Sequence, residues 1–154
     1  MSVIAWRIVK GKHIKIAFQG TGARRYGGRW NSPGTAVVYT AEHQSLAVLE
    51  LLAHIERPQL FHDYNLIRVE IPESVISDYD QSTLPANWRS DPPPLTLREA
   101  GNKWVRAMSS AVLRVPSTIV PAENNYLLNV NHPDFAGLVI GSPIPFSFDP
   151  RLAK

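Results

Sequence analysis

The alternation of apolar and polar positions along the chain predicts several short strands and two helices. Runs of β-branched and aromatic residues bounded by glycine, proline or asparagine are typical of strands. Such runs cover residues 3–9, 36–40, 64–71, 112–120, 126–130, 138–140 and 146–148. Strands and helices therefore mix along a chain of 154 residues. This mixture favours a single α+β domain over residues 1–154, with mixed small sheets and flanking helices.

The first predicted helix carries a carboxylate in an otherwise apolar run. It is expected to begin with Thr40 as its N-cap and to reach about Ile55, before Pro58. Residues 46–53 are apolar on every side of this helix apart from Glu50, so we expect the helix to be buried. An unpaired buried charge costs on the order of several kcal/mol. Glu50 is therefore expected to face a cation or a polar cavity.

Two arginines are candidate partners for this carboxylate. Arg7 and Arg29 lie in or beside apolar or glycine-rich segments rather than in charged ones. A buried Glu–Arg pair could belong to an active site or could only fix the packing. The pattern alone supports both interpretations equally.

A second helix is expected to begin at the capping box that runs from Thr96 to Glu99. Apolar residues recur on one of its faces at helical spacing, namely Leu97, Ala100, Trp104 and Met108. Gly101 interrupts this helix and is expected to weaken it by about 1 kcal/mol relative to alanine.

Two long connections separate the predicted elements. Residues 18–34 contain five glycines, and a connection of this length in a compact domain is usually functional, so we expect a ligand loop there. Residues 77–94 contain four prolines together with several aspartates, which indicates a surface loop that could serve as a lid.

Composition excludes several classes of function. The chain has no cysteine, which excludes disulfides, thiolate zinc sites and a thiol nucleophile. Its five histidines are scattered, with none of the spacing of a helical zinc site, so no metal is predicted. A net charge of +3 is too small an excess to indicate nucleic acid. The first ten residues hold no long apolar stretch, so we expect no signal peptide or membrane helix and a cytoplasmic protein.

The motif Gly27-Gly28-Arg29-Trp30-Asn31 is followed by Tyr39 and then by Glu50. A loop, a strand and a helix in succession could bring this cation, phenol and carboxylate to one cleft, where active sites usually lie. The glycine spacing matches neither the phosphate-binding P-loop nor the dinucleotide fingerprint.

Several motifs in the same order resemble the RES domain, a family named after an arginine, a glutamate and a serine. They are Trp6-Arg7, Gly27-Gly28-Arg29-Trp30-Asn31, Val38-Tyr39-Thr40-Ala41, Leu46-Ala47-Val48-Leu49-Glu50, Val115-Pro116-Ser117 and Asp149-Pro150-Arg151-Leu152. The resemblance implies a bacterial toxin of a RES–Xre toxin–antitoxin pair with an ADP-ribosyltransferase-like fold. Such toxins break the bond between nicotinamide and ribose in NAD, which arrests growth, and an Xre-type antitoxin blocks the site. NAD is thus the expected substrate, and no cofactor is expected.

The resemblance also assigns roles to individual residues. Glu50, Arg29 and Tyr39 are the expected catalytic residues, with Glu50 stabilising the positive charge that develops on the ribose. Substrate binding is expected from a second set, namely Arg7, Gly27, Gly28, Asn31 and Ser117. In this set the arginine grips phosphate oxygens, the glycines let the backbone approach the ligand, and the serine offers a hydrogen bond.

Other interpretations stay open at this stage. The acceptor of the ADP-ribosyl group could be water, phosphate or a protein, and a transferase would use the same arginine and glutamate. A noncatalytic module that binds a nucleotide is a further alternative. The apolar content permits a homodimer, while nothing in the sequence indicates a membrane or nucleic-acid partner.

Overall fold

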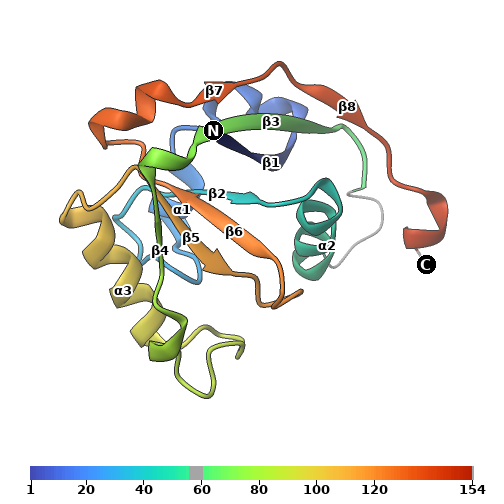
Figure 1. Ribbon diagram of the computed structural model, residues 1–154. Coiled ribbons are helices and arrows are strands. Elements are labelled where there is room, and N and C mark those ends of the chain that lie inside the picture. Colours follow the sequence, from blue (N-terminus) through green and yellow to red (C-terminus); the bar gives the residue numbers. More distant parts are fainter. Residues whose placement is uncertain (56–60, 154) are drawn as a thin grey trace.

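The computed structural model describes residues 1–55 and 61–153, in which eight strands form one twisted sheet (Figure 1). The strands are β1 (Ser2–Lys10), β2 (Val38–Ala41), β3 (Tyr64–Pro72), β4 (Ile76–Asp78), β5 (Val112–Pro116), β6 (Asn124–Leu128), β7 (Val139–Ile140) and β8 (Ile144–Phe146). Their order is β4-β5-β6-β2-β1-β3-β7, and β8 also pairs with β3. The pair β4–β5 is parallel and the other pairs are antiparallel. The expected α+β class is confirmed, although one sheet replaces the expected small sheets.

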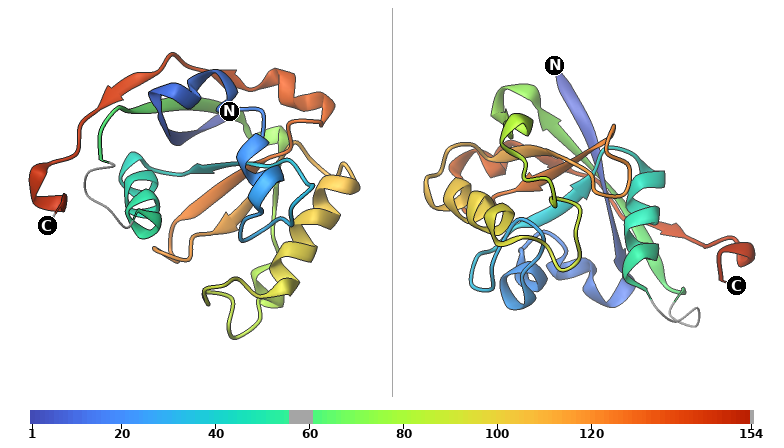
Figure 2. Two further views of the ribbon diagram at one scale, coloured as in Figure 1. Left: turned by 180° about the vertical axis from the view of Figure 1, so that it is seen from behind. Right: turned by 90° about the horizontal axis from the view of Figure 1, so that it is seen from below.

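Three α-helices and several 3-10 turns surround this sheet. The α-helices are α1 (Thr21–Tyr26), α2 (Gln44–His54) and α3 (Leu95–Arg106), and the 3-10 turns are η1 (Gly11–Ile16), η3 (Glu73–Val75), η4 (Gln81–Thr83), η5 (Pro133–Gly137) and η6 (Pro150–Ala153). In the left panel of Figure 2, η1 and α1 both lie on the side of the sheet that faces the viewer, while α2 and α3 lie on opposite sides of the view. No helix in the described part of the chain is both long and apolar enough to cross a bilayer.

The core has layers because neighbouring residues of a strand point to opposite faces of the sheet. On β6, Tyr126 and Leu128 join the cluster that contains Val38 and Val112. The residue between them, Leu127, joins a second cluster under α3. The central strands are therefore buried on both faces, as their continuous apolar runs indicate.

Helix α2 differs from its sequence prediction at its start. Thr40 is not its N-cap, because this residue lies in β2 and its hydroxyl donates to the carbonyl of Tyr126 at 2.8 Å. The helix begins at Gln44 and ends at His54, close to the expected end. Pro58, which was expected to follow the helix, lies outside the described residues.

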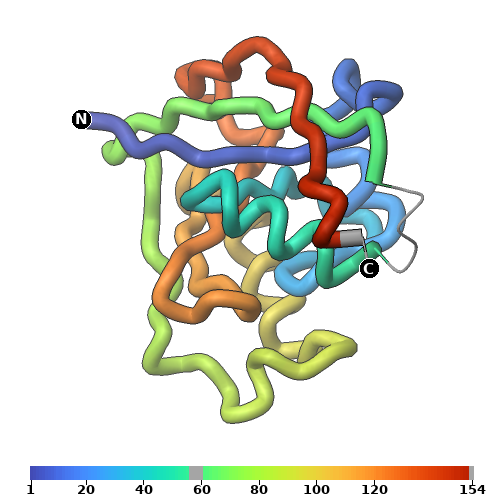
Figure 3. The backbone as a smooth tube through the Cα atoms, turned by 90° about the vertical axis from the view of Figure 1, so that its right-hand side faces the viewer, coloured from blue at the N-terminus to red at the C-terminus, as the bar shows by residue number. Residues whose placement is uncertain are grey.

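Helix α2 is also less buried than predicted. Leu46 and Ala47 pack on the sheet, but Leu49 is 44% exposed. The outer face lies beside the segment that follows β8 (Figure 3). With Phe146 and Leu152 it lines a groove of about 510 Å³. The apolar residues on both faces of α2 therefore reflect two neighbours rather than full burial.

Helix α3 and the loop 18–34 show two further differences. The capping box is wrong, because α3 begins at Leu95 and Pro94 stands at its N-cap without a side-chain bond. The glycine-rich connection contains α1, which ends at Gly27, whose φ of +78° favours glycine. This short helix has too few residues to show an apolar period.

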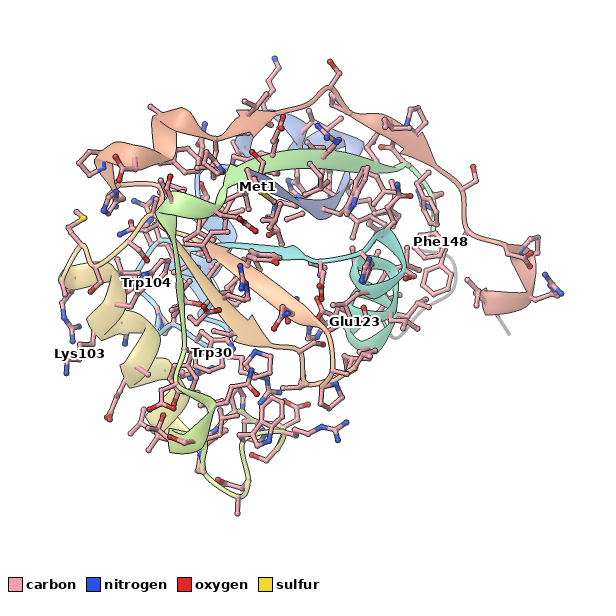
Figure 4. All side chains as sticks on the ribbon, in the orientation of Figure 1. Met1, Trp30, Lys103, Trp104, Glu123 and Phe148 are labelled. Atoms are coloured by element: carbon pink, nitrogen blue, oxygen red, sulfur yellow. The ribbon has the colours of Figure 1, made fainter. Side chains whose placement is uncertain are left out.

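Gly101 has a packing reason that helix propensity does not reveal. A Cβ atom at this position would overlap the carbonyl oxygen of Trp30. Trp30 and Trp104 lie where α3 meets the sheet, and both belong to the cluster that also contains Leu97 (Figure 4). The glycine thus allows α3 to approach the chain at Trp30.

We expect Gly101→Ala to lower the free energy of unfolding by about 1–3 kcal/mol, because an overpacked contact forces the backbone to shift. Propensity alone would give the opposite sign, a gain of about 1 kcal/mol. Gly22→Ala in α1 is the matched control, because no atom lies within 4 Å of the added Cβ. Denaturant unfolding of both variants measures the difference, and a stabilised Gly101→Ala would contradict this packing argument.

Candidate functional site

A cleft of about 1320 Å³ opens between β1, β2, α1, α2 and the loop that precedes α3. Six of the residues that the sequence singled out line it, namely Arg7, Gly27, Gly28, Arg29, Tyr39 and Glu50. Asn31 and Ser117 are fully buried, each with 0% exposure, and they contact Tyr39 and Glu50 respectively. The structure thus brings the predicted set together in two layers, one that faces the cleft and one behind it.

The carboxylate of Glu50 is held by neutral donors. The side-chain amide of Asn125 donates to Oε1 at 2.8 Å and to Oε2 at 2.9 Å. The hydroxyl of Ser117 donates to Oε1 at 3.0 Å. That hydroxyl accepts in turn from the backbone N–H groups of Ile119 and Val120 at 3.1 and 3.2 Å. Glu50 is therefore fixed in position, with part of its surface left to the cleft.

These contacts correct the expectation that Glu50 pairs with an arginine. Among the described residues, no ion pair joins Glu50 to Arg7 or Arg29. Burial raises the pKa of Glu50 above its ordinary value of 4.5, and the hydrogen bonds from Asn125 and Ser117 oppose that rise. The negative charge of Glu123 adds to the rise. Neutral hydrogen-bond donors thus stabilise the carboxylate of Glu50 while its negative charge is retained.

Asn125 is a site residue that the sequence did not identify. The strand was predicted to begin only at residue 126, but Asn125 lies in β6, opposite Ala41 of β2. Its amide also donates to the carbonyl of Thr40 at 3.2 Å. A polar residue beside the continuous apolar run of β6 was the available signal, and only the strand pairing reveals that it faces Glu50.

Glu123 brings a second carboxylate to this end of the sheet. It lies on the hairpin between β5 and β6, near α2 (Figure 4). Its Oε1 atom is buried without a hydrogen-bond partner among the described residues, and its backbone carbonyl accepts from Ser117. The β5–β6 segment that supplies the donors for Glu50 therefore also supplies a like charge, which destabilises the ionised form of Glu50.

Tyr39 uses its hydroxyl to organise the glycine loop. The hydroxyl donates to Oδ1 of Asn31 at 2.6 Å and accepts from the backbone N–H of Trp30 at 3.0 Å. The amide of Asn31 donates to the carbonyls of Ala23 and Thr35 at 2.8 and 3.0 Å. Burial raises the pKa of Tyr39 far above its ordinary value, so the phenol stays protonated and acts as a donor.

Gly28 is required by the same network. A Cβ atom at this position would lie 2.6 Å from the hydroxyl oxygen of Tyr39 and 2.9 Å from Oδ1 of Asn31. The glycine was expected to let the backbone approach a ligand. The structure adds that the phenol itself occupies the space beside Gly28, so a larger residue would displace Tyr39.

Arg29 joins the glycine loop to the proline-rich loop that precedes α3. Its Nη1 donates to the carbonyls of Trp88 and Ser90 at 3.0 and 2.8 Å. Burial lowers the pKa of Arg29, and the charge of Asp91 opposes this shift. Arg98, which lies in α3, also holds the glycine loop, because its Nε donates to the carbonyl of Gly28 at 3.0 Å. The loop considered as a lid is thus held against the mouth of the cleft.

Arg7 lines the cleft with a guanidinium that is only partly hydrogen-bonded within the protein. Its Nη1 donates to the carbonyl of Tyr39 at 3.0 Å. Its Nε is buried and has no hydrogen-bond partner among the described residues. Burial lowers the pKa of Arg7 to about 10, so the guanidinium remains charged at neutral pH. A buried donor without a partner is unfavourable. The charge of this guanidinium in the wall of the cleft favours an anionic ligand.

The lining of the cleft is strongly cationic. Lysine and arginine side chains outnumber carboxylates, with Arg7, Lys10, Arg25, Arg29, Arg89 and Arg98 set against Glu50 and Asp91. Within residues 1–55 and 61–153, no three His, Asp or Glu side chains gather closely enough to hold a metal ion. The site therefore combines one carboxylate with positive charge suited to a phosphate-bearing ligand.

Comparison with known proteins places this site in a family. The family model described as "RES domain" matches residues 4–149. A protein named "Toxin Res" from Yersinia enterocolitica is 42% identical over 97% of this chain and 99% of its own length. A second "Toxin Res", from Photorhabdus laumondii, is 40% identical over 99% of this chain and 98% of its own length. A "Prs ADP-ribosylating toxin" from Sphingobium sp. is 34% identical over 100% of this chain and 99% of its own length.

The fold has a solved counterpart. A chain in the crystal structure of the M. tuberculosis MbcT–MbcA toxin–antitoxin complex superposes with a TM-score of 0.79. The match covers 96% of this chain and 85% of that chain at 15% identity, so it establishes a common fold. Since the family model spans nearly the whole chain and full-length relatives reach 42% identity, the chain belongs to the RES domain family.

Proposed function

We propose that this protein is the toxin of a toxin–antitoxin pair and that it cleaves the nicotinamide–ribose bond of NAD. The names of its relatives from Yersinia and Photorhabdus support the role as a toxin. The observation that carries the proposed chemistry is the carboxylate of Glu50, held by Asn125 and Ser117 at a cleft with cationic walls. A fixed anion among cations suits a substrate that carries phosphates and develops positive charge at one carbon.

The departure of nicotinamide leaves positive charge on the ribose, shared between its C1 carbon and its ring oxygen. Glu50 stabilises that charge because its carboxylate is already oriented and need not reorganise during the reaction. Its donors are neutral, so the full negative charge remains available to the substrate. An arginine partner would have cancelled much of this effect.

The surrounding residues divide into two roles. Arg7 and Arg29 line the cleft, and we assign the remaining donors of their guanidinium forks to the phosphate oxygens. Asn31 and Ser117 are fully buried, so we assign them to positioning: Asn31 holds Tyr39, and Ser117 holds Glu50. The hydroxyl of Tyr39 is occupied, which leaves its ring to pack against the substrate.

The excess of cations supports phosphate as the acceptor of the ADP-ribosyl group. The diphosphate of NAD brings two negative charges, whereas the cleft lining holds more than two uncompensated cations. A second anion would therefore be attracted to the same cleft. Water remains the alternative acceptor, and the name of the Sphingobium relative supports transfer to a protein as a second candidate activity.

An antitoxin completes the proposal. The solved counterpart of the fold comes from a toxin–antitoxin complex, and we propose an Xre-type antitoxin that covers the cleft of this chain. NAD loss in the cytoplasm then stops growth whenever the antitoxin is absent.

The first test is Glu50→Gln, which keeps the shape of the side chain while it removes the charge and replaces one acceptor oxygen by a donor. We expect nicotinamide release from NAD to fall by about 10²–10⁴-fold, the range for the loss of one electrostatic or acid–base group. Chromatography of nicotinamide measures the rate. Glu70→Gln is the matched control, because Glu70 lies on β3 outside the cleft, and its release should equal that of wild type. A folded Glu50→Gln variant with full activity would overturn the proposal.

The second test uses pH. The ionised form of Glu50 is the active one and burial raises its pKa, so the rate should fall on acidification with a midpoint above the ordinary value of 4.5. A raised pKa also means that ionisation of Glu50 opposes folding. The stability of wild type relative to Glu50→Gln should therefore be greatest below pH 4.5 and should decrease as pH rises through the folded-state pKa. Initial rates and denaturant midpoints between about pH 4 and 8 measure both effects. A rate that stays constant to below pH 4.5 would contradict this assignment.

The third test identifies the acceptor. Purified protein is incubated with NAD in buffers with and without phosphate, and the products are separated by chromatography. We expect nicotinamide release to depend on phosphate and ADP-ribose 1-phosphate to accumulate. Free ADP-ribose in either buffer would identify water as the acceptor. Label from NAD on a protein in a cell extract, without release in the purified system, would favour the transferase.

A further inference from the structure

The charges of this chain are divided unevenly along its sequence. Residues 1–41 contain seven lysines and arginines and no aspartate or glutamate. Residues 42–154 contain nine lysines and arginines against 13 acidic residues. The small net charge of +3 therefore conceals a strongly basic first part and an acidic remainder. The fold determines whether these cations form one surface.

Four of these cations are exposed residues of η1 and α1, two elements that lie on the same side of the molecule (Figure 2). This basic patch consists of Lys12 and Lys15 on η1 and of Arg24 and Arg25 on α1, all of them exposed. In the described part of the chain, none of the four forms an ion pair with a carboxylate. The carboxylate of Asp63 lies beside Gly11 at the margin of the patch.

Apolar side chains lie among these cations. Tyr26 is 72% exposed, with Arg25 stacked 5.4 Å from the centre of its ring, and Ile16 is 40% exposed. A surface with exposed cations and large apolar groups can bind a partner that offers both charge and packing.

The basic patch continues directly into the cleft. Arg25 of the patch also lines the cleft, as do Ile16 and Tyr26 beside the patch. Lys10 and His13 line the cleft as well. A chain that lay across the patch would therefore run towards the inner arginines. An anionic segment there would compete with the phosphates of the substrate for the same guanidinium groups.

We propose that the basic patch is the docking surface for an acidic polypeptide segment of the partner protein. This inference rests on the proposed function, since it identifies the chemistry by which an antitoxin would recognise this cleft. Carboxylates of the segment pair with Lys12, Lys15 and Arg24, and its apolar residues pack on Ile16 and Tyr26. The charges of the patch steer the encounter, and the segment blocks the cleft because the two surfaces are continuous.

The distribution of charge favours a polypeptide over a nucleic acid. A nucleic acid carries its charges in a long regular array and needs a basic stripe of similar length. The patch is confined to η1 and α1, and the remainder of the chain, with its excess of carboxylates, would repel the rest of a long polyanion. A short acidic segment can match the patch alone.

The experiment compares two triple variants of the full chain. Lys12→Glu/Lys15→Glu/Arg24→Glu reverses three patch residues that do not line the cleft, whereas Arg68→Glu/Lys103→Glu/Arg106→Glu reverses three exposed cations elsewhere. Both variants change the net charge equally. The probe is a fluorescent peptide of about 12 residues, long enough to span ~40 Å, made of glutamate with interspersed leucine and tyrosine. A lysine peptide of the same length and a single-stranded oligothymidylate are the comparison ligands.

We expect wild type to bind the acidic peptide, and we expect the peptide to slow NAD cleavage. Binding should weaken about tenfold or more in the patch variant and by no more than about twofold in the control variant. It should also weaken as salt rises from about 50 to about 300 mM. The inference is overturned by equal weakening in both variants, by tighter binding of the oligothymidylate, or by NAD cleavage without any binding of the acidic peptide. Patch-dependent binding by a protein that leaves NAD intact would keep the docking surface and reject the proposed function.

Discussion

The arrangement of this site depends on a half-buried carboxylate that uncharged donors hold in place. Glu50 would be far easier to bury beside an arginine, yet its partners are the amide of Asn125 and the hydroxyl of Ser117. Hydrogen bonds of this kind stabilise the ionised form only in part, which is why its pKa stays raised. The protein thus keeps a charge in an unfavourable place, and such perturbed groups mark functional sites.

That carboxylate needs rigid neighbours, and the fold supplies them from its sheet. Asn125 lies in a central strand, and Ser117 follows the strand paired with it. The glycine loop that carries Arg29 is held by three contacts. They are made by the hydroxyl of Tyr39, by the side chain of Asn31, and by α3 where it meets Trp30. Arg29 thus lies on a loop that neighbouring strands and α3 hold in place, which matches the usual position of binding residues on the loops of a fixed scaffold.

The sequence allowed the element types and the front layer of the site to be predicted, because both rest on local pattern. Apolar runs located the strands apart from β4, which overlaps the segment predicted to be a surface loop. The ordered motifs were sufficient to group Arg29, Tyr39 and Glu50 at one cleft. The partners of Glu50 could not be predicted, since Asn125 meets it only through the pairing of β2 with β6. The packing role of Gly101 could not be predicted for a similar reason, because helix propensity does not reflect the contact with the carbonyl of Trp30. Local sequence patterns therefore do not predict contacts between segments that are distant along the chain.

The same distance in sequence has a consequence for how the protein is made. Glu50 is 75 residues from Asn125 and 67 from Ser117, and Arg98 is 70 residues from the carbonyl that it binds. Contacts of this separation form late, after the chain that joins them has been synthesised and folded. A nascent chain on the ribosome therefore holds an unfinished cleft until β6 has emerged and paired with β2. The complete cleft, and with it the proposed cleavage of NAD, is available only once most of the polypeptide has been synthesised. Translation therefore sets the earliest moment at which inhibition of the cleft would be required.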